Sequence, residues 1–244
     1  MLLAAGLGLT SVAQAQNTKK FSIGFKVSPN FSWSKVVDGP MKSNGLGLGF
    51  SYGLSMDYNV LGSDNYWLNG DLMISTIPTK VQMSTDFKRD ANNNKVYKDV
   101  TYDYALQYIQ IPLSFKLKTD DIGGMRYYLN AGLGLSFLLG AQASAASGNG
   151  TDFYDGDGIT HHDPNDTTTS KYDFVATGAT KEYLDDINGS RVSMIIGAGG
   201  EYPVSANMKM VFGLKLDNGF TDIIKSDLVN ARNNYLSLQL GLMF

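Results

Sequence analysis

The residues best suited to chemistry in this 244-residue chain form a stretch of aspartates and histidines. In chain order they are Asp152, Asp155, Asp157, His161, His162, Asp163 and Asp166. Carboxylate oxygens suit calcium, and neighbouring imidazoles admit a transition metal. The spacing does not match an EF-hand, because Gly158 comes too early and no glutamate closes the loop. We therefore favour a solvated acidic loop. The residues that stay candidates for a metal are Asp155, Asp157, His161, His162 and Asp163.

The same stretch could serve catalysis only if a histidine stood beside a nucleophile. His161 and His162 are the two histidines of the chain, and we find no ordered Ser-His-Asp arrangement around them. Cysteine is absent, which excludes disulfides and thiolate chemistry. We expect neither an enzyme nor a cofactor, and a hydrolase at the rim of the fold is our last hypothesis.

A second set of chemically able residues alternates with apolar ones along the chain. Between residues 45 and 58, for example, Leu46, Leu48 and Phe50 alternate with glycine and serine. Side chains of a strand point alternately to its two faces, so the apolar set covers one face and the polar set the other. The polar and charged side chains predicted to share the inner face are Lys26, Asp57, Asp71, Gln110, Lys116, Arg126, Arg191, Glu201, Lys209, Lys215 and Gln239.

Both signs of charge occur in this inward set, so we expect ion pairs and hydrogen bonds across the interior of the fold. If eight strands close into a barrel, the interior is just wide enough for side chains to fill it. The favoured interpretation is a polar plug that holds the barrel closed. The alternative is a proton relay or a narrow ion path through the same residues.

The elements that position these residues are eight strands with alternating faces. The pattern predicts them at 21–28, 45–58, 66–77, 102–117, 126–139, 191–202, 208–216 and 234–244. The fourth changes parity, because Leu106 and Tyr108 continue one apolar series while Ile109 and Ile111 begin the other. One inserted residue shifts the parity of a strand, so we predict a β-bulge at Tyr108–Ile109.

The last strand, 234–244, indicates the environment of the sheet. Its apolar series runs from Leu236 to Phe244, and a soluble edge strand of this kind would invite aggregation. A transmembrane barrel needs such a face, because lipid covers it, and no run of 18 apolar residues provides a membrane helix instead. We therefore predict an all-β, antiparallel up-and-down barrel whose last strand pairs with the first. Leu240, Leu242 and Phe244 resemble the terminal signal that barrel-assembly machinery reads.

Connections between the predicted strands alternate between short and long. Tight turns lie near residues 62, 122 and 204, which places both barrel termini in the periplasm and the long loops outside. Pro78 is expected at the outer rim, with a hairpin at 81–104 standing above it. Its edge could recruit a partner strand, or it could dock on the acidic loop, because it is rich in basic residues. These are Lys80, Lys88, Arg89, Lys95 and Lys98.

The beginning of the chain has the pattern of an export signal. Residues 1–15 combine a short apolar core with a small-x-small cleavage site, although no basic residue precedes it, so the start could lie inside a longer signal. A short periplasmic segment, 16–20, would then lead into a barrel over 21–244. The formal net charge of −3 gives no case for nucleic acid.

Particular segments resemble a known family. Residues 108–116, Tyr-Ile-Gln-Ile-Pro-Leu-Ser-Phe-Lys, are similar to a recurring segment of the PorT-like outer-membrane β-barrel proteins of Bacteroidota. Residues 26–32 resemble the first-strand signature of that family, with Ser28 where glycine is usual, and 131–134 and 197–202 fit its later strands. The resemblance implies an eight-stranded outer-membrane barrel without catalytic residues. One member of the family belongs to the type IX secretion apparatus.

Together these observations predict an integral outer-membrane barrel with a structural or surface-interaction role exerted through its external loops. The expected partners are the lipid bilayer, the assembly machinery during insertion and other outer-membrane proteins. An accessory subunit of a type IX-like secretion complex or of an uptake complex is the first alternative. A narrow pore is the second.

Overall fold

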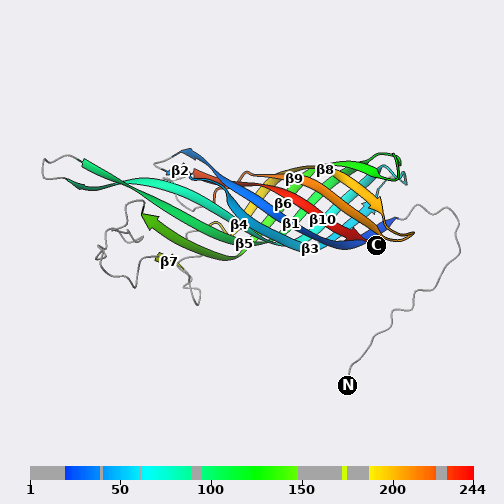
Figure 1. Ribbon diagram of the computed structural model, residues 1–244, viewed down its shortest axis with the longest axis horizontal. Helices are drawn as coiled ribbons and strands as arrows, with labels where there is room; N and C mark the ends of the chain where they lie inside the picture. Colours follow the sequence, from blue (N-terminus) through cyan, green and yellow to red (C-terminus); the bar gives the residue numbers. More distant parts are fainter. Residues whose placement is uncertain are drawn as a thin grey trace, which may run out of the picture.

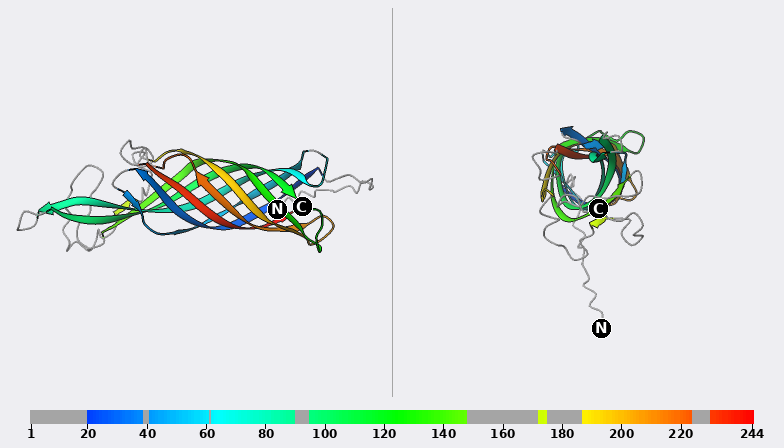
Figure 2. Two further views of the ribbon diagram at one scale, coloured as in Figure 1. Left: turned by 90° about the horizontal axis from the view of Figure 1, so that it is seen from above. Right: turned by 90° about the vertical axis from the view of Figure 1, so that its left-hand side faces the viewer.

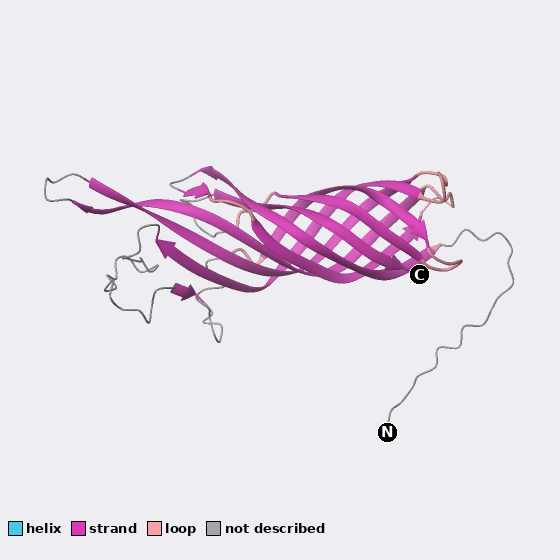
Figure 3. Ribbon diagram, viewed as in Figure 1, coloured by secondary structure: helices cyan, strands magenta, loops and turns pink. Residues whose placement is uncertain are grey.

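The computed structural model describes residues 20–38, 41–60, 62–89, 95–147, 172–174, 187–223 and 230–244. Within these ranges no helix has the length and apolarity to span a membrane. The regular structure is formed by strands (Figure 3). They are β1 (Phe21–Asp38), β2 (Met41–Ser43), β3 (Gly47–Asn59), β4 (Tyr66–Arg89), β5 (Lys95–Lys118), β6 (Arg126–Ser147), β7 (Tyr172–Phe174), β8 (Ser190–Pro203), β9 (Lys209–Gly219) and β10 (Asn230–Met243).

Eight long strands of the described chain close into an antiparallel barrel, which confirms the predicted fold. Each strand pairs with its neighbour in the order β1, β3, β4, β5, β6, β8, β9 and β10, and β10 returns to β1. The closing ladder places Phe25 opposite Leu242 and Val27 opposite Leu240. The predicted pairing of the first and last strands is therefore confirmed, and the end-on view in Figure 2 shows the ring.

The alternation of the sequence becomes an apolar outside and a polar inside. On β10, Leu238 and Leu240 are exposed, whereas Ser237 and Gln239 are buried. Leu48 on β3 is 73% exposed, although leucine ordinarily lies inside a soluble fold. A continuous outer surface of this kind is suited to lipid.

The strands differ greatly in length, and the difference concentrates at one end of the barrel. The β3–β4 ladder ends at the pair Phe50–Thr76, close to Pro78, while β4 and β5 stay paired as far as Arg89 and Lys95. A hairpin therefore projects beyond the ring, at the end opposite the C-terminus (Figure 1). The hairpin predicted at 81–104 is confirmed, and it continues the barrel strands β4 and β5 with one shift of register between Asp86 and Lys88.

The first strand is longer than the sequence predicts. The pattern ends it at Ser28, but β1 continues to Asp38 because Pro29 lies within it without a change of register. Val27 pairs with Leu240 and Asn30 with Ser237, so the ladder resumes in the same frame after the proline. A proline removes one donor from a ladder but does not by itself end a strand whose other neighbours stay paired.

The bulge lies on a different strand from the one predicted. Gln107 pairs with Gly140 and Tyr108 with Leu138, so the extra residue is Leu139 of β6, while β5 keeps one parity throughout. Leu106 and Tyr108 consequently point inward and are buried. The prediction was wrong because these side chains are apolar and were assigned to the lipid face.

The short connections gather at the end where the C-terminus lies (Figure 1). Three of their glycines adopt positive φ, namely Gly62 at 70°, Gly123 at 67° and Gly124 at 82°. This backbone conformation is costly for residues that carry a Cβ, so glycine allows the tight reversals there.

Candidate functional site

The interior of the barrel is organised in layers, and the layer nearest the short turns is a cluster of charges. Asp57 is fully buried and lies 2.9 Å from the Nζ atom of Lys116 and 3.4 Å from that of Lys118. Glu201 lies 2.9 Å from Lys118 and 2.8 Å from Lys209. Residues distant in sequence thus meet because β3, β5, β8 and β9 project them into one lumen.

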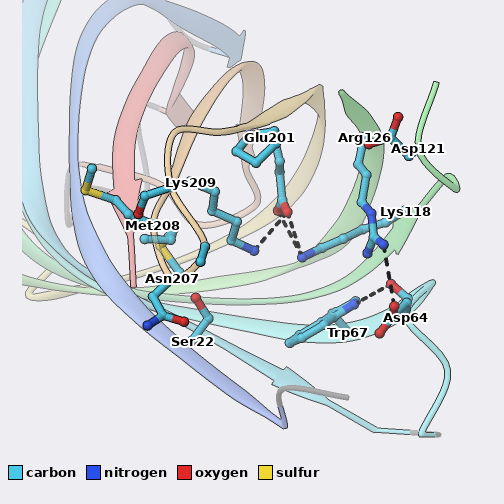
Figure 4. A pocket seen from close by; sticks show the side chains of 14 residues that line it. Ser22, Asp64, Trp67, Lys118, Asp121, Arg126, Glu201, Asn207, Met208 and Lys209 are labelled. Atoms are coloured by element: carbon cyan, nitrogen blue, oxygen red, sulfur yellow. Dashed lines mark hydrogen bonds and ion pairs between the residues drawn. The ribbon is translucent and has the colours of Figure 1, made fainter. Parts of the chain in front are cut away.

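A pocket of about 620 Å³ opens from this cluster at the short-turn end (Figure 4). Trp67 forms one wall, with its Nε1–H donating to the carbonyl oxygen of Asp64 and with Lys118 Nζ 4.1 Å from its ring centroid. Arg126 reaches the carboxylate of Asp64 at 3.5 Å across the mouth. The charged residues lining the pocket balance, so it does not select one sign of charge. They are Lys118, Arg126, Lys209, Asp64, Asp121 and Glu201.

The middle layer is built around one buried ion pair. Lys26 Nζ on β1 donates to Asp71 on β4 at 3.0 Å. Ser55 Oγ also donates to this carboxylate at 2.6 Å, and Asn69 donates at 3.2 Å. Several donors thus surround a carboxylate that is removed from water, which is the condition for a buried charge to be tolerated.

The third layer joins charged and neutral side chains around Tyr235. The Tyr235 hydroxyl donates to Asp217 at 2.8 Å and lies 3.0 Å from Gln110 Oε1. Arg191 forms an ion pair with Asp217 and donates to the carbonyl oxygen of Asn233 at 2.9 Å. This layer connects β5, β8, β9 and β10 across the lumen.

Above the polar layers, toward the long loops, lies an apolar cluster inside the barrel. Ile77 and Leu106 are fully buried in it, and Tyr108 packs there with its ring inside. The other members come from β6, β10 and the connections beside them, namely Ala141, Ile187, Ile223 and Tyr235. These apolar side chains occupy the lumen of a barrel that eight strands make narrow.

The structure brings most of the predicted inward residues together. Those buried in the lumen are Lys26, Asp57, Asp71, Gln110, Lys116, Arg191, Glu201, Lys215 and Gln239. Lys209 is half-buried at the mouth, with 22% of its side chain exposed. Arg126 is not part of the lumen network, because it stands at the first residue of β6, where its side chain is 38% exposed and pairs with Asp64. The candidate metal residues of the acidic stretch lie outside the described residues.

Sequence reasoning missed central members of the network. Lys118 and Asp217 are charged, and each lies two residues beyond a predicted inward lysine of the same strand. Continuing the alternation by one more inward position would therefore have found them. Tyr235 and Trp67 were not selected, because an aromatic residue at a strand end is equally expected at a lipid interface. Only their burial in the folded chain, at 0% and 5% exposure, assigns them to the interior.

The comparisons with known proteins agree with this geometry. Residues 12–225 match the family described as outer membrane protein beta-barrel domain. The chain belongs to that family. It is thus an integral outer-membrane protein whose apolar outer face lies against lipid. No curated protein sequence matches the chain.

Solved structures similar to this chain are remote in sequence. The Neisserial surface protein A is 14% identical over 91% of this chain and 96% of its own, with a TM-score of 0.39. Ail, the attachment invasion locus protein of Yersinia pestis, is 12% identical over 92% and 99%, with a TM-score of 0.39. The outer membrane protease OmpT from Escherichia coli is 7% identical over 95% and 98%, with a TM-score of 0.40. No function transfers to this chain from likenesses of this size.

Proposed function

We propose that this chain is a non-conducting, non-enzymatic barrel with a surface-interaction role. In this proposal both barrel termini are periplasmic, and the sheet formed by β4, β5 and β6 rises outside the cell as the interaction element. The observation that carries the proposal is the length by which the β4–β5 hairpin exceeds the β3–β4 ladder. Beyond Thr76 it extends the strands by roughly 40 Å, at about 3.3 Å per residue.

The outer part of β4 has the backbone of a strand-recruiting edge. On the side of β4 that faces β3 in the barrel, β2 covers Val81 to Met83. From Ser84 to Arg89, no strand of the described chain pairs with that side. An edge of this kind offers a row of N–H and C=O groups, to which an extended segment of a partner can add.

The filled interior supports the non-conducting half of the proposal. The charged layers pair across the lumen, and the apolar cluster around Leu106 and Tyr108 lies above them. We expect purified protein in planar bilayers to stay at baseline conductance. Stepwise conductance from a homogeneous preparation would favour the narrow pore instead.

The interaction half is tested by shortening the hairpin. Met83 and Val100 are ladder partners, so deleting 84–99 and joining them through Asn-Gly forms a two-residue turn and leaves the barrel pairs intact. We expect the shortened protein to keep its heat-modifiable gel shift, but to lose a protein that co-purifies with the full chain in mild detergent. The matched control retains the backbone and replaces Lys88, Arg89, Lys95 and Lys98 by Gln.

The two variants separate pairing at the strand edge from attraction by charge. Retention of the partner in the control and its loss on shortening would support pairing through the edge. If the shortened protein recovers the same partners as the full chain, the hairpin is not the interaction element. Partners that persist and belong to a secretion or uptake complex would then favour an accessory subunit, docked through the lipid face or the periplasmic turns.

A further inference from the structure

A groove with two lysines in its lining lies at the end of the barrel where the hairpin projects. The lining of this groove, whose volume is about 420 Å³, comes from β1 and β2. It consists of Trp33, Ser34, Lys35, Val36, Lys42 and Ser43. The two strands come together here because β3 begins only at Gly47, so β2 lies beside the outer parts of β1 and β4 (Figure 1).

The cations of this groove point away from the lumen. On β1 the even residues Ser32 and Ser34 are buried inside, so Trp33 and Lys35 face outward. Lys42 is exposed and pairs with Gln82 of β4, on the same side of the sheet as Lys80. Lys42 and Lys80 are therefore diagonal neighbours, and residues in this relation are about 7–8 Å apart, within reach of long side chains.

The two lysines of the groove have no acidic partner among the residues that the structure describes. Lys35 stands opposite Arg232 in the β1–β10 ladder, and like charges in that position destabilise a sheet. Arg232 forms an ion pair with Asp222 at 3.4 Å, whereas Lys35 has no such partner among the described residues. An anion lying between the two cations would relieve the repulsion.

The position of the groove relative to the lipid face indicates which anion it takes. Phe31 lies one outward position below Trp33 and is 41% exposed, as part of the apolar surface against the acyl chains. Lysines that follow directly after such a surface lie at the depth of the lipid headgroups. We propose that the groove binds the phosphate of an anionic membrane lipid, with Lys35 and Lys42 as its ligands and Trp33 beside the lipid.

The chain provides its own reporter for this site. It contains two tryptophans, Trp33 in the groove and Trp67 inside the barrel at the opposite end. The variant Trp67→Phe therefore leaves Trp33 as the single fluorophore. Should this variant fold poorly, the wild-type chain serves equally, because buried Trp67 adds a constant background that lipid does not reach.

The experiment measures which lipid lies beside Trp33. The single-tryptophan protein is placed in phosphatidylcholine nanodiscs that contain a low mole fraction of phosphatidylglycerol with brominated acyl chains, and bromine quenches a tryptophan that it contacts. A parallel sample contains brominated phosphatidylcholine at the same mole fraction. Each lysine near an anionic headgroup contributes roughly fivefold to partitioning, so we expect strong preferential quenching by the anionic lipid.

Lysine variants decide whether the groove is responsible. In Lys35→Gln/Lys42→Gln the preference is expected to disappear, while Lys20→Gln, an exposed lysine beside the short turns, is expected to retain it. Equal quenching by the two lipids would overturn the proposal, as would a preference that survives the double substitution. Loss of the preference on adding inorganic phosphate at constant ionic strength would assign a site for free anions rather than for lipid. None of these outcomes depends on the partner of the hairpin.

Discussion

Replacing Asp57 by Asn removes a charge on which three lysines depend while nearly preserving side-chain shape. Asp57 is fully buried, and the Nζ atoms of Lys116, Lys118 and Lys209 lie 2.9, 3.4 and 3.6 Å from its carboxylate. At an effective dielectric constant of about 20, these separations correspond to attractions of about 6, 5 and 5 kcal/mol. The carboxylate of Glu201 would then remain as the one acid of this cluster.

The measured loss is expected to be smaller than that sum. A neutral amide avoids the several kcal/mol that desolvation of a carboxylate costs, so much of the attraction is offset. Removing one partner of a buried pair typically costs about 3–5 kcal/mol, and we expect Asp57→Asn to fall in this range. Asp64→Asn is the matched control, because Asp64 is 46% exposed and pairs with Arg126 at 3.5 Å. We expect it to cost about 0–1 kcal/mol.

The assay is urea unfolding in lipid vesicles, followed by tryptophan fluorescence and by the heat-modifiable gel shift. Lys116→Met added to Asp57→Asn is expected to recover part of the loss, since it removes one uncompensated buried cation. A free energy of unfolding for Asp57→Asn within about 1 kcal/mol of the Asp64→Asn value would refute the reasoning. The charged layer would then be a passive filling of the lumen, with no measurable part in holding the barrel closed.

Two further predictions concern the barrel wall. Leu238→Lys, near the middle of β10 on the lipid face, should lower the free energy of unfolding in vesicles by about 2–4 kcal/mol. Leu46→Lys, beside the rim, should lower it by about 0–1 kcal/mol. Equal losses would contradict the placement of the membrane. Gly132→Ala should reduce the fraction of folded barrel seen in the heat-modifiable gel shift, because its Cβ would overlap the carbonyl oxygen of Leu113 on β5. In the control Gly140→Ala the new Cβ meets no atom within 4 Å, so this variant should fold normally. Normal folding of both would show that the strands separate more easily than their packing implies.

Local pattern was sufficient to predict the eight barrel strands and most of their faces, although not the full length of β1 or the inward face of Leu106 and Tyr108. A period of two is a property of neighbouring residues, so the exposed Leu238 and buried Gln239 could be assigned without knowing what pairs with β10. An even number of strands and alternating connection lengths then left one closed arrangement, in which the last strand meets the first. Most of the inward charged set, including Asp57 and Lys116, follows from the same parity.

What the sequence could not determine is which inward residues meet and what the inward apolar residues do. The contacts of Asp57 depend on the stagger of strands around the ring, a property of the closed sheet that no single segment encodes. Leu106 and Tyr108 have the composition of a lipid-facing pair, and only the continuous β4–β5 register places them inside. Lipid and a dry lumen both favour apolar side chains, so the sequence pattern alone cannot distinguish a lipid-facing residue from an inward one. Tertiary structure decides between the two because it determines which face of each strand closes around the interior.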